Sequence, residues 1–150
     1  MTVSHTISET EEIYNKFTLV KKLEFSSKSL EDSEMNWNYT GKGEICVRQD
    51  GNDIYFSEDI YIDENTLLKD SKMWRFEKDV IEFYHFRNKN YEKIFTFTVK
   101  DGEFILKQKY ECAPDCYSGS LKVKEENICF RINIRGKRKN EEITYIYTRS

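Results

Sequence analysis

The sequence predicts an all-β protein, in which about ten strands form a single antiparallel up-and-down β-barrel. Three observations lead to this prediction. From Tyr14 onward, apolar and polar residues alternate with a period of two, which is typical of half-buried strands. Aromatic residues make up 15% of the chain, and they favour strands over helices. The connections are too short for the crossovers that parallel pairing needs, so neighbouring strands must be antiparallel.

Ten segments carry the alternation, and short turns separate them. The intervening stretches, such as QDGND, RNKN and KDG, are rich in Asn, Asp and Gly, which favour tight hairpins. Sequential hairpins that close into a barrel leave no unpaired sheet edge. A two-layer sandwich with a solid core is the alternative. The predicted strands are 16–25, 37–49, 53–63, 67–79, 80–86, 92–99, 103–112, 116–123, 128–135 and 142–149.

Each strand is predicted from the residues that share one of its faces. In the second segment, Gly41 and Gly43 permit a bend or bulge. The faces of the other nine are, in chain order, Phe17, Leu19, Leu23 and Phe25; Ile54, Phe56, Ile60 and Ile62; Lys72, Trp74 and Phe76; Ile81, Phe83 and His85; Phe95, Phe97 and Val99; Phe104, Leu106, Gln108, Tyr110 and Cys112; Tyr117, Gly119, Leu121 and Val123; Ile128, Phe130, Ile132 and Ile134; and Ile143, Tyr145, Tyr147 and Arg149.

A chain of 150 residues is long enough for one domain with a sizeable core. We expect residues 1–12 to form a flexible N-terminal segment and residues 13–150 to form the barrel domain. The net charge of -3 gives no electrostatic reason to expect nucleic acid or an anionic membrane as a partner. No stretch approaches the roughly 18 apolar residues that a membrane span requires. The sequence does not indicate an oligomeric state.

The first residues lack the basic start and apolar run of a signal peptide, so we expect a cytoplasmic protein. In that compartment the four cysteines are expected to be thiols, not disulfides. Their spacing does not match a paired zinc motif, and Cys112 with Cys116 makes a poor metal site because no histidine is near. We therefore expect no metal and no cofactor.

Six polar residues interrupt the predicted apolar faces: Lys21, Glu58, Lys72, His85, Gln108 and Arg149. A buried charge without a partner costs several kcal/mol, so each of these groups must pair, reach water or bind something. We expect Glu58 to pair with Lys72 or Arg149 across the barrel, and the other groups to face a cavity. The alternative is a closed ion pair that braces the barrel and contacts no ligand.

The second half of the chain resembles a known family. Cys112, Asp115, Tyr117 and Gly119 follow the spacing C-x-x-D-x-Y-x-G. Gly136, Arg138 and Lys139 then lie in the turn GKRK, and a last strand closes at Arg149. These segments resemble the domain-of-unknown-function family numbered 6314, which is described as lipocalin-like.

The resemblance extends over about residues 14–149. The stretches MWRF and IEFYHF resemble the family's central strands, and IYFSED places Glu58 on the family's glutamate. Three positions depart from the pattern: Lys137 stands for a proline, Phe95 for a histidine and Ile132 for a tryptophan. The resemblance implies a lipocalin-like, calycin-type barrel and no particular activity.

A barrel of about ten strands is wide enough to hold a ligand, so we expect a small hydrophobic or amphipathic molecule inside it. Aromatic side chains would form the wall and polar ones would orient the polar end. The candidate binding residues are Glu58, Lys72, Trp74, Phe76, Phe83, His85, Phe97, Gln108, Tyr110 and Arg149.

Three other interpretations stay open. Glu58 and His85 could act as acid and base in a small isomerase or hydratase that uses the same cavity. A plugged barrel could instead act as a protein-interaction module. His85 could also be a haem ligand, although a single strand histidine is more often packed or hydrogen-bonded. The charged turn RGKRKNEE is expected to be solvated, with a phosphate or acidic contact as the alternative.

Overall fold

The computed structural model describes residues 8–63, 65–107, 110–112 and 114–150. Within these ranges the chain forms one helix and eleven antiparallel strands in a single sheet. The elements are α1 (Glu9–Thr18), β1 (Lys22–Ser29), β2 (Tyr39–Asp50), β3 (Asp53–Ile62), β4 (Thr66–Glu77), β5 (Val80–Arg87), β6 (Asn90–Lys100), β7 (Glu103–Leu106), β8 (Tyr110–Cys112), β9 (Asp115–Lys124), β10 (Asn127–Arg135) and β11 (Asn140–Thr148).

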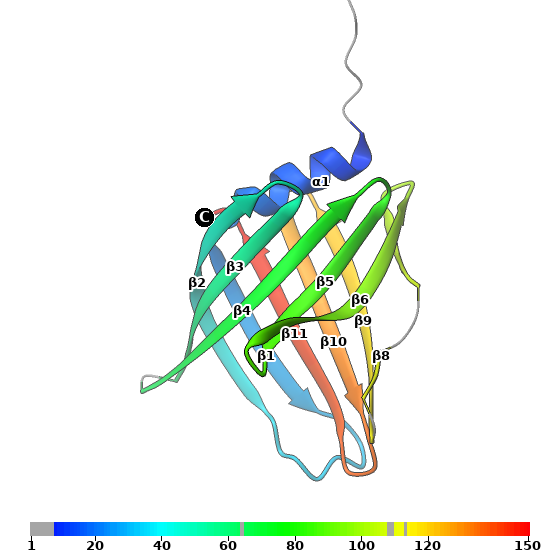
Figure 1. Ribbon diagram of the computed structural model, residues 1–150. Helices are drawn as coiled ribbons and strands as arrows, with labels where there is room; N and C mark the ends of the chain where they lie inside the picture. The colour runs from blue at the N-terminus through cyan, green and yellow to red at the C-terminus, as the bar shows by residue number, and fades with distance from the viewer. Residues whose placement is uncertain (1–7, 64, 108–109, 113) are drawn as a thin grey trace, which may run out of the picture.

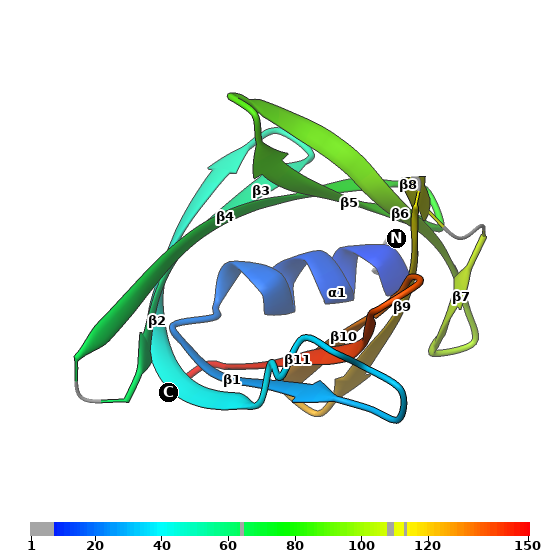
Figure 2. The same ribbon diagram turned by 90° about the horizontal axis from the view of Figure 1, so that it is seen from below.

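The sheet curls into a nearly closed barrel, as the sequence predicts (Figures 1 and 2). Its strand order is β7-β6-β5-β4-β3-β2-β1-β11-β10-β9-β8, so every pair of neighbouring strands is consecutive in the chain except β1 and β11. The predicted strand 103–112 is divided into β7, which pairs with β6, and β8, which pairs with β9. The two ends of the sheet are thus β7 and β8, and among the described residues no ladder joins them; β7 lies against β9 at this seam.

The register of the ladder follows the hydrophobic alternation. In β3, the side chains of Ile54, Phe56, Ile60 and Ile62 are buried, and Glu58 lies on the same buried face. The RNKN turn is a two-residue hairpin in which Asn88 and Lys89 both have positive φ, at 54° and 67°. This conformation matches the twist of the flanking strands.

Helix α1 is the main departure from the predicted elements. Residues 16–19 were expected to begin the first strand, but the helix runs to Thr18 and the strand starts at Lys22. The Ser8 Oγ accepts a hydrogen bond of 3.2 Å from the Glu11 backbone N–H, which caps the helix. The helix buries Ile13 and Phe17, which are four residues apart and therefore share one face.

The helix closes one end of the barrel, which we call the proximal end; the opposite end is the distal end (Figures 1 and 2). Phe17 is fully buried, and its ring lies 5.1 Å from Trp74 and 5.2 Å from Phe76. The rings of Phe83 and Phe130 extend this aromatic core toward the middle of the barrel. Side chains thus fill the proximal half. Among the described residues, no helix is long and apolar enough to cross a membrane.

Candidate functional site

A buried ionic cluster crosses the middle of the barrel. The Lys72 Nζ, on β4, contacts Glu58 Oε1 of β3 and lies 3.0 Å from Asp70 Oδ2. The Tyr147 hydroxyl, on β11, donates a hydrogen bond of 2.7 Å to Glu58 Oε2. The side chains of Lys72 and Glu58 are 1% and 0% exposed. Glu58 therefore has Lys72, one of its two predicted partners, and the contact is closed to water.

Opposing effects set the charges of this cluster. Burial raises the pKa of Glu58 above its ordinary value, and Lys72 partly offsets the rise. Burial lowers the pKa of Lys72, but Glu58 and its other neighbours raise it well above its ordinary value. The ammonium also lies 3.7 Å from the centroid of the Tyr145 ring, a cation–π contact. Burial raises the pKa of Tyr145 to about 12. These contacts therefore favour the ammonium form of Lys72.

Asp70 connects this cluster to His85 on β5. The Asp70 Oδ1 lies 2.6 Å from His85 Nε2, while Oδ2 faces Lys72. Burial raises the pKa of Asp70, but Lys72 and His85 outweigh this effect and lower it far below the ordinary value of 3.8. The His85 side chain is 33% exposed, so it marks the transition from the closed cluster to solvent.

A cavity of about 240 Å³ occupies the distal half of the barrel. Aliphatic and aromatic side chains make up most of its wall, and the ionisable groups Lys72, His85 and Arg87 lie among them. The lining residues are Trp37, Lys72, Phe83, His85, Arg87, Ile94, Tyr117, Ile132, Ile134, Ile143 and Tyr145.

Arg87, Glu92 and Tyr110 form a second polar group beside this wall. The Arg87 Nε donates a hydrogen bond of 2.8 Å to Glu92 Oε2, and its Nη2 donates one of 3.0 Å to the Tyr110 hydroxyl. That hydroxyl in turn donates to Glu92 Oε1. Hydrogen bonds from Arg87 and Tyr110 lower the pKa of Glu92. The carboxylate thus accepts one hydrogen bond from each of two side chains.

The loop between β1 and β2 carries Trp37 to the cavity, and a buried carboxylate anchors it. Glu141 is 0% exposed, and its oxygens accept hydrogen bonds from Ser29 Oγ, at 2.6 Å, and from Ser33 Oγ. The Ser29 hydroxyl also accepts a hydrogen bond of 2.7 Å from the Trp37 backbone N–H. Trp37 is therefore part of a fixed wall.

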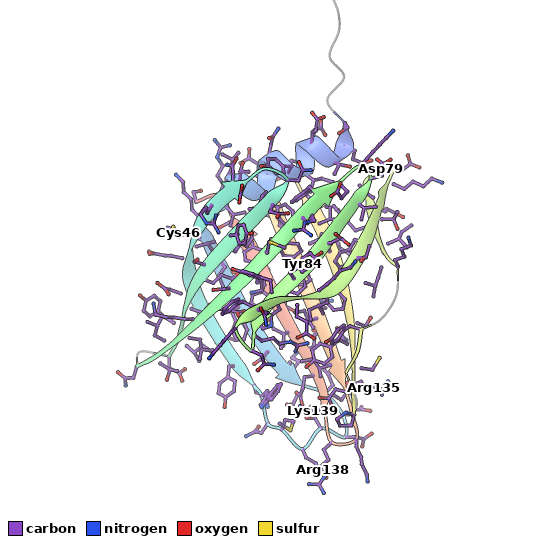
Figure 3. The ribbon with its side chains drawn as sticks, viewed as in Figure 1. Cys46, Asp79, Tyr84, Arg135, Arg138 and Lys139 are labelled. Carbon is purple, nitrogen blue, oxygen red and sulfur yellow. The ribbon has the colours of Figure 1, made fainter. Side chains whose placement is uncertain are left out.

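The motif segments meet at the distal end. The Asp115 Oδ2 lies 3.1 Å from Lys139 Nζ, and Lys139 in turn lies 5.7 Å from the centroid of the Trp37 ring. Gly136 leaves room for Asp115, because a Cβ there would stand 2.2 Å from its Oδ1. Figure 3 shows Lys139 at this end together with Arg135 and Arg138. The C-x-x-D-x-Y-x-G corner and the GKRK turn thus support one wall of the cavity.

Residues 22–149 match the family of unknown function DUF6314. The chain belongs to this family. No curated protein and no solved structure matches the chain. The match covers every strand but not α1. The family is one of unknown function, so the match assigns no activity to the chain.

The structure brings only some of the predicted site residues to the cavity. Lys72, Phe83 and His85 line the cavity, and Tyr110 lies beside it through its contact with Arg87. Trp74, Phe76 and Phe97 belong to the packed core and do not line the cavity, and Glu58 is enclosed in the ionic cluster. Gln108 lies outside the described residues, and of Cys112 only the backbone is described.

Two residues were wrongly placed on the inner face. Arg149 follows the parity of β11, but it stands beyond the last paired residue, Thr148, and is exposed with its Nη1 3.1 Å from Glu126 Oε1. Lys21 precedes β1 and is also exposed. In both cases the alternation continues past the end of the strand, where it no longer selects a face.

Sequence reasoning missed Asp70, Arg87 and Glu92. A β-bulge between β5 and β6 inserts Ile94, so that Ile94 and Phe95 are both buried and the alternation changes phase. In the ladder, Glu92 then stands opposite His85 on the inner face, whereas an uninterrupted alternation would place Glu92 on the outer face. Trp37 was predicted to begin the strand 37–49, but β2 begins at Tyr39, and Trp37 lines the cavity from the preceding loop. The two adjacent buried apolar residues were the available signal for the bulge.

Proposed function

We propose that this protein binds a small amphipathic molecule in the distal cavity. One observation carries the proposal: a space of about 240 Å³ inside the barrel has a mostly apolar wall and a polar side formed by His85 and Arg87. At about 30 Å³ for each water molecule, this volume suits a ligand with on the order of ten heavy atoms. The apolar part would lie against Ile94, Ile132 and Ile143.

Solvent access sets the orientation of the ligand. The Arg87 and His85 side chains are 26% and 33% exposed, whereas Lys72 is closed off by its two carboxylates. The polar end would therefore face Arg87 and His85. An eight-carbon chain contributes at most about 6 kcal/mol by burial, so we expect dissociation constants between tens of micromolar and millimolar.

The two tryptophans provide a direct test with 1-octanol as the probe. Trp37 lines the cavity, and Trp74 is fully buried in the core. We expect 1-octanol to change the tryptophan emission in a saturable way. Trp74→Phe should retain the change and Trp37→Phe should lose it, while native mass spectrometry still detects the adduct in both.

A variant that fills the cavity supplies the control. Ile132→Trp places an indole in the ligand space, and it should abolish the adduct while the far-ultraviolet circular dichroism stays that of a β protein. The proposal is refuted if the wild-type protein forms no adduct and shows no emission change at millimolar 1-octanol. It is equally refuted if Ile132→Trp binds as well as the wild type.

A second candidate function is proton transfer within the same cavity, and the contact between His85 and Asp70 favours it. An imidazole held by a carboxylate is a common arrangement for a general base. Glu58 is a poor partner for this chemistry because Lys72 and Tyr147 occupy its oxygens. If a small molecule co-purifies with the protein, its chemical conversion on incubation would support an enzyme, provided that the His85→Asn variant does not convert it. If the molecule stays chemically unchanged, the result would support binding alone.

A further inference from the structure

We propose that the ligand of this cavity is a carboxylate-ended amphiphile, and that its carboxylate replaces that of Glu92 at Arg87. This inference rests on the proposed function and adds the chemical class of the ligand's polar end. It assigns Arg87 as the binding residue and Glu92 as an exchangeable occupant of the same position.

The geometry at Arg87 is that of a carboxylate site already filled by the chain. The guanidinium Nε and the Tyr110 hydroxyl donate to the two oxygens of Glu92, and Arg87 Nη2 holds the Tyr110 hydroxyl in place at 3.0 Å. Planar guanidinium donors match a carboxylate in spacing and charge. Arg87 also belongs to the cavity wall, so the same donors are within reach of a molecule inside.

Glu92 is the carboxylate that a ligand can displace. Its side chain is 40% exposed and can turn into water, whereas Glu58 is 0% exposed and Asp70 is held by both Lys72 and His85. Because one carboxylate leaves as another arrives, the charge beside Arg87 stays the same. The exchange therefore avoids the cost of adding a net charge to a partly buried site.

The other ionisable groups of the wall disfavour different end groups. An ammonium end would be repelled by the Arg87 guanidinium, the partly exposed cation of the lining, since Lys72 is enclosed by its two carboxylates. A neutral hydroxyl could accept one hydrogen bond from Arg87, but it could not displace the ionised Glu92, which is held by two donors. A carboxylate is the end group that reproduces both contacts of Glu92.

The experiment compares octanoate, 1-octanol and octylamine, which share one chain and differ in end group. Titration calorimetry on the full chain would measure each dissociation constant at pH 7. We expect octanoate to bind more tightly than 1-octanol, and octylamine to bind most weakly. Arg87→Gln should raise the dissociation constant of octanoate by at least about tenfold, because it removes charged hydrogen bonds. The dissociation constant of 1-octanol should change by less than about twofold.

Glu92→Gln removes the charge of the competing carboxylate and should lower the dissociation constant of octanoate by about two- to fivefold. The exposed pair of Arg149 and Glu126 supplies a matched control, because Arg149→Gln breaks a similar contact far from the cavity wall. That variant should leave all three dissociation constants unchanged. If Arg87→Gln does not fold, the response of Glu92→Gln alone decides the outcome.

The results separate the two proposals. If no compound binds, both the ligand-binding function and this inference are wrong. If 1-octanol binds and octanoate binds no better, or if Glu92→Gln leaves octanoate unchanged, the cavity function stands and the assignment of Arg87 is overturned. The assignment of Arg87 is also overturned if Arg87→Gln weakens the binding of octanoate and of 1-octanol equally, because the side chain would then affect only the shape of the cavity.

Discussion

Replacing Lys72 by methionine is expected to destabilise the barrel by about 3–5 kcal/mol at pH 7.5. Lys72 and Glu58 are 1% and 0% exposed, so the substitution leaves a carboxylate buried without its cation. Of the contacts that hold Glu58, the Tyr147 hydroxyl at 2.7 Å would remain. At about 2–4 °C for each kcal/mol, the melting temperature should fall by about 6–20 °C.

The stability lost in Lys72→Met should depend on pH. Burial already raises the pKa of Glu58 above 4.5, and loss of the Lys72 ammonium raises it further. The folded variant then binds a proton that the unfolded chain releases, so its stability falls as pH rises above about 4.5. The difference from the wild type should therefore be smaller at pH 5 than at pH 8.

Urea unfolding followed by circular dichroism at both pH values would measure these differences. The double variant Glu58→Gln/Lys72→Met separates the unpaired charge from the loss of packing, because a neutral amide still accepts from Tyr147. It should be more stable than Lys72→Met alone. A destabilisation below about 1 kcal/mol for Lys72→Met, or no recovery in the double variant, would refute the argument that the pair is closed and dry.

Three further predictions concern the rest of the barrel. Phe17→Ala should cost about 3–5 kcal/mol in urea unfolding, since the ring is fully buried at the proximal end; a cost below 1 kcal/mol would show that α1 is not part of the core. Gly119→Ala should cost about 1–3 kcal/mol, because its Cβ would stand 2.7 Å from the Phe95 ring, and the added variant Phe95→Leu should recover part of the loss in melting temperature. Ionised Asp70, whose pKa is lowered, contributes stability above pH 3.8 that is lost as pH falls through its folded pKa. Asp70→Asn should therefore be less stable at pH 7 and lose less stability between pH 5 and pH 3 in thermal melts, and an acid profile identical to the wild type would contradict this.

The fold class could be predicted because it depends on local patterns that survive in the tertiary structure. Alternation selects the buried face of β3, and the RNKN turn forms the hairpin that its composition indicates. The first strand was misread because Phe17 and Leu19 continue the alternation of Leu23. The capping signal of Ser8 and Glu11 and the spacing of Ile13 and Phe17 favoured a helix.

The site could be predicted only in part. A charged residue on an apolar face predicts a partner, and this reasoning found the contact between Glu58 and Lys72. The Arg87 and Glu92 contact could not be found in the same way, because a bulge changes which residues face inward. The position of Trp37 depends on Glu141, which holds the hydroxyls of Ser29 and Ser33 although it lies more than 100 residues from them in the sequence.

The pairing of β1 with β11 has a consequence for how the protein is made. Every other ladder joins consecutive strands and can form as the chain emerges. The ladder of β1 with β11, in which Lys22 stands opposite Thr148, can form only after the last strand has been synthesised. Until β11 is synthesised, β1 and β10 each present an open edge to other chains. The same late strand supplies the Tyr147 hydroxyl for Glu58. A nascent chain halted before Asn140 would thus expose unpaired strand edges that can associate with other chains, and it would lack one buried hydrogen bond. Chaperones and proteases would be expected to recognise such a chain.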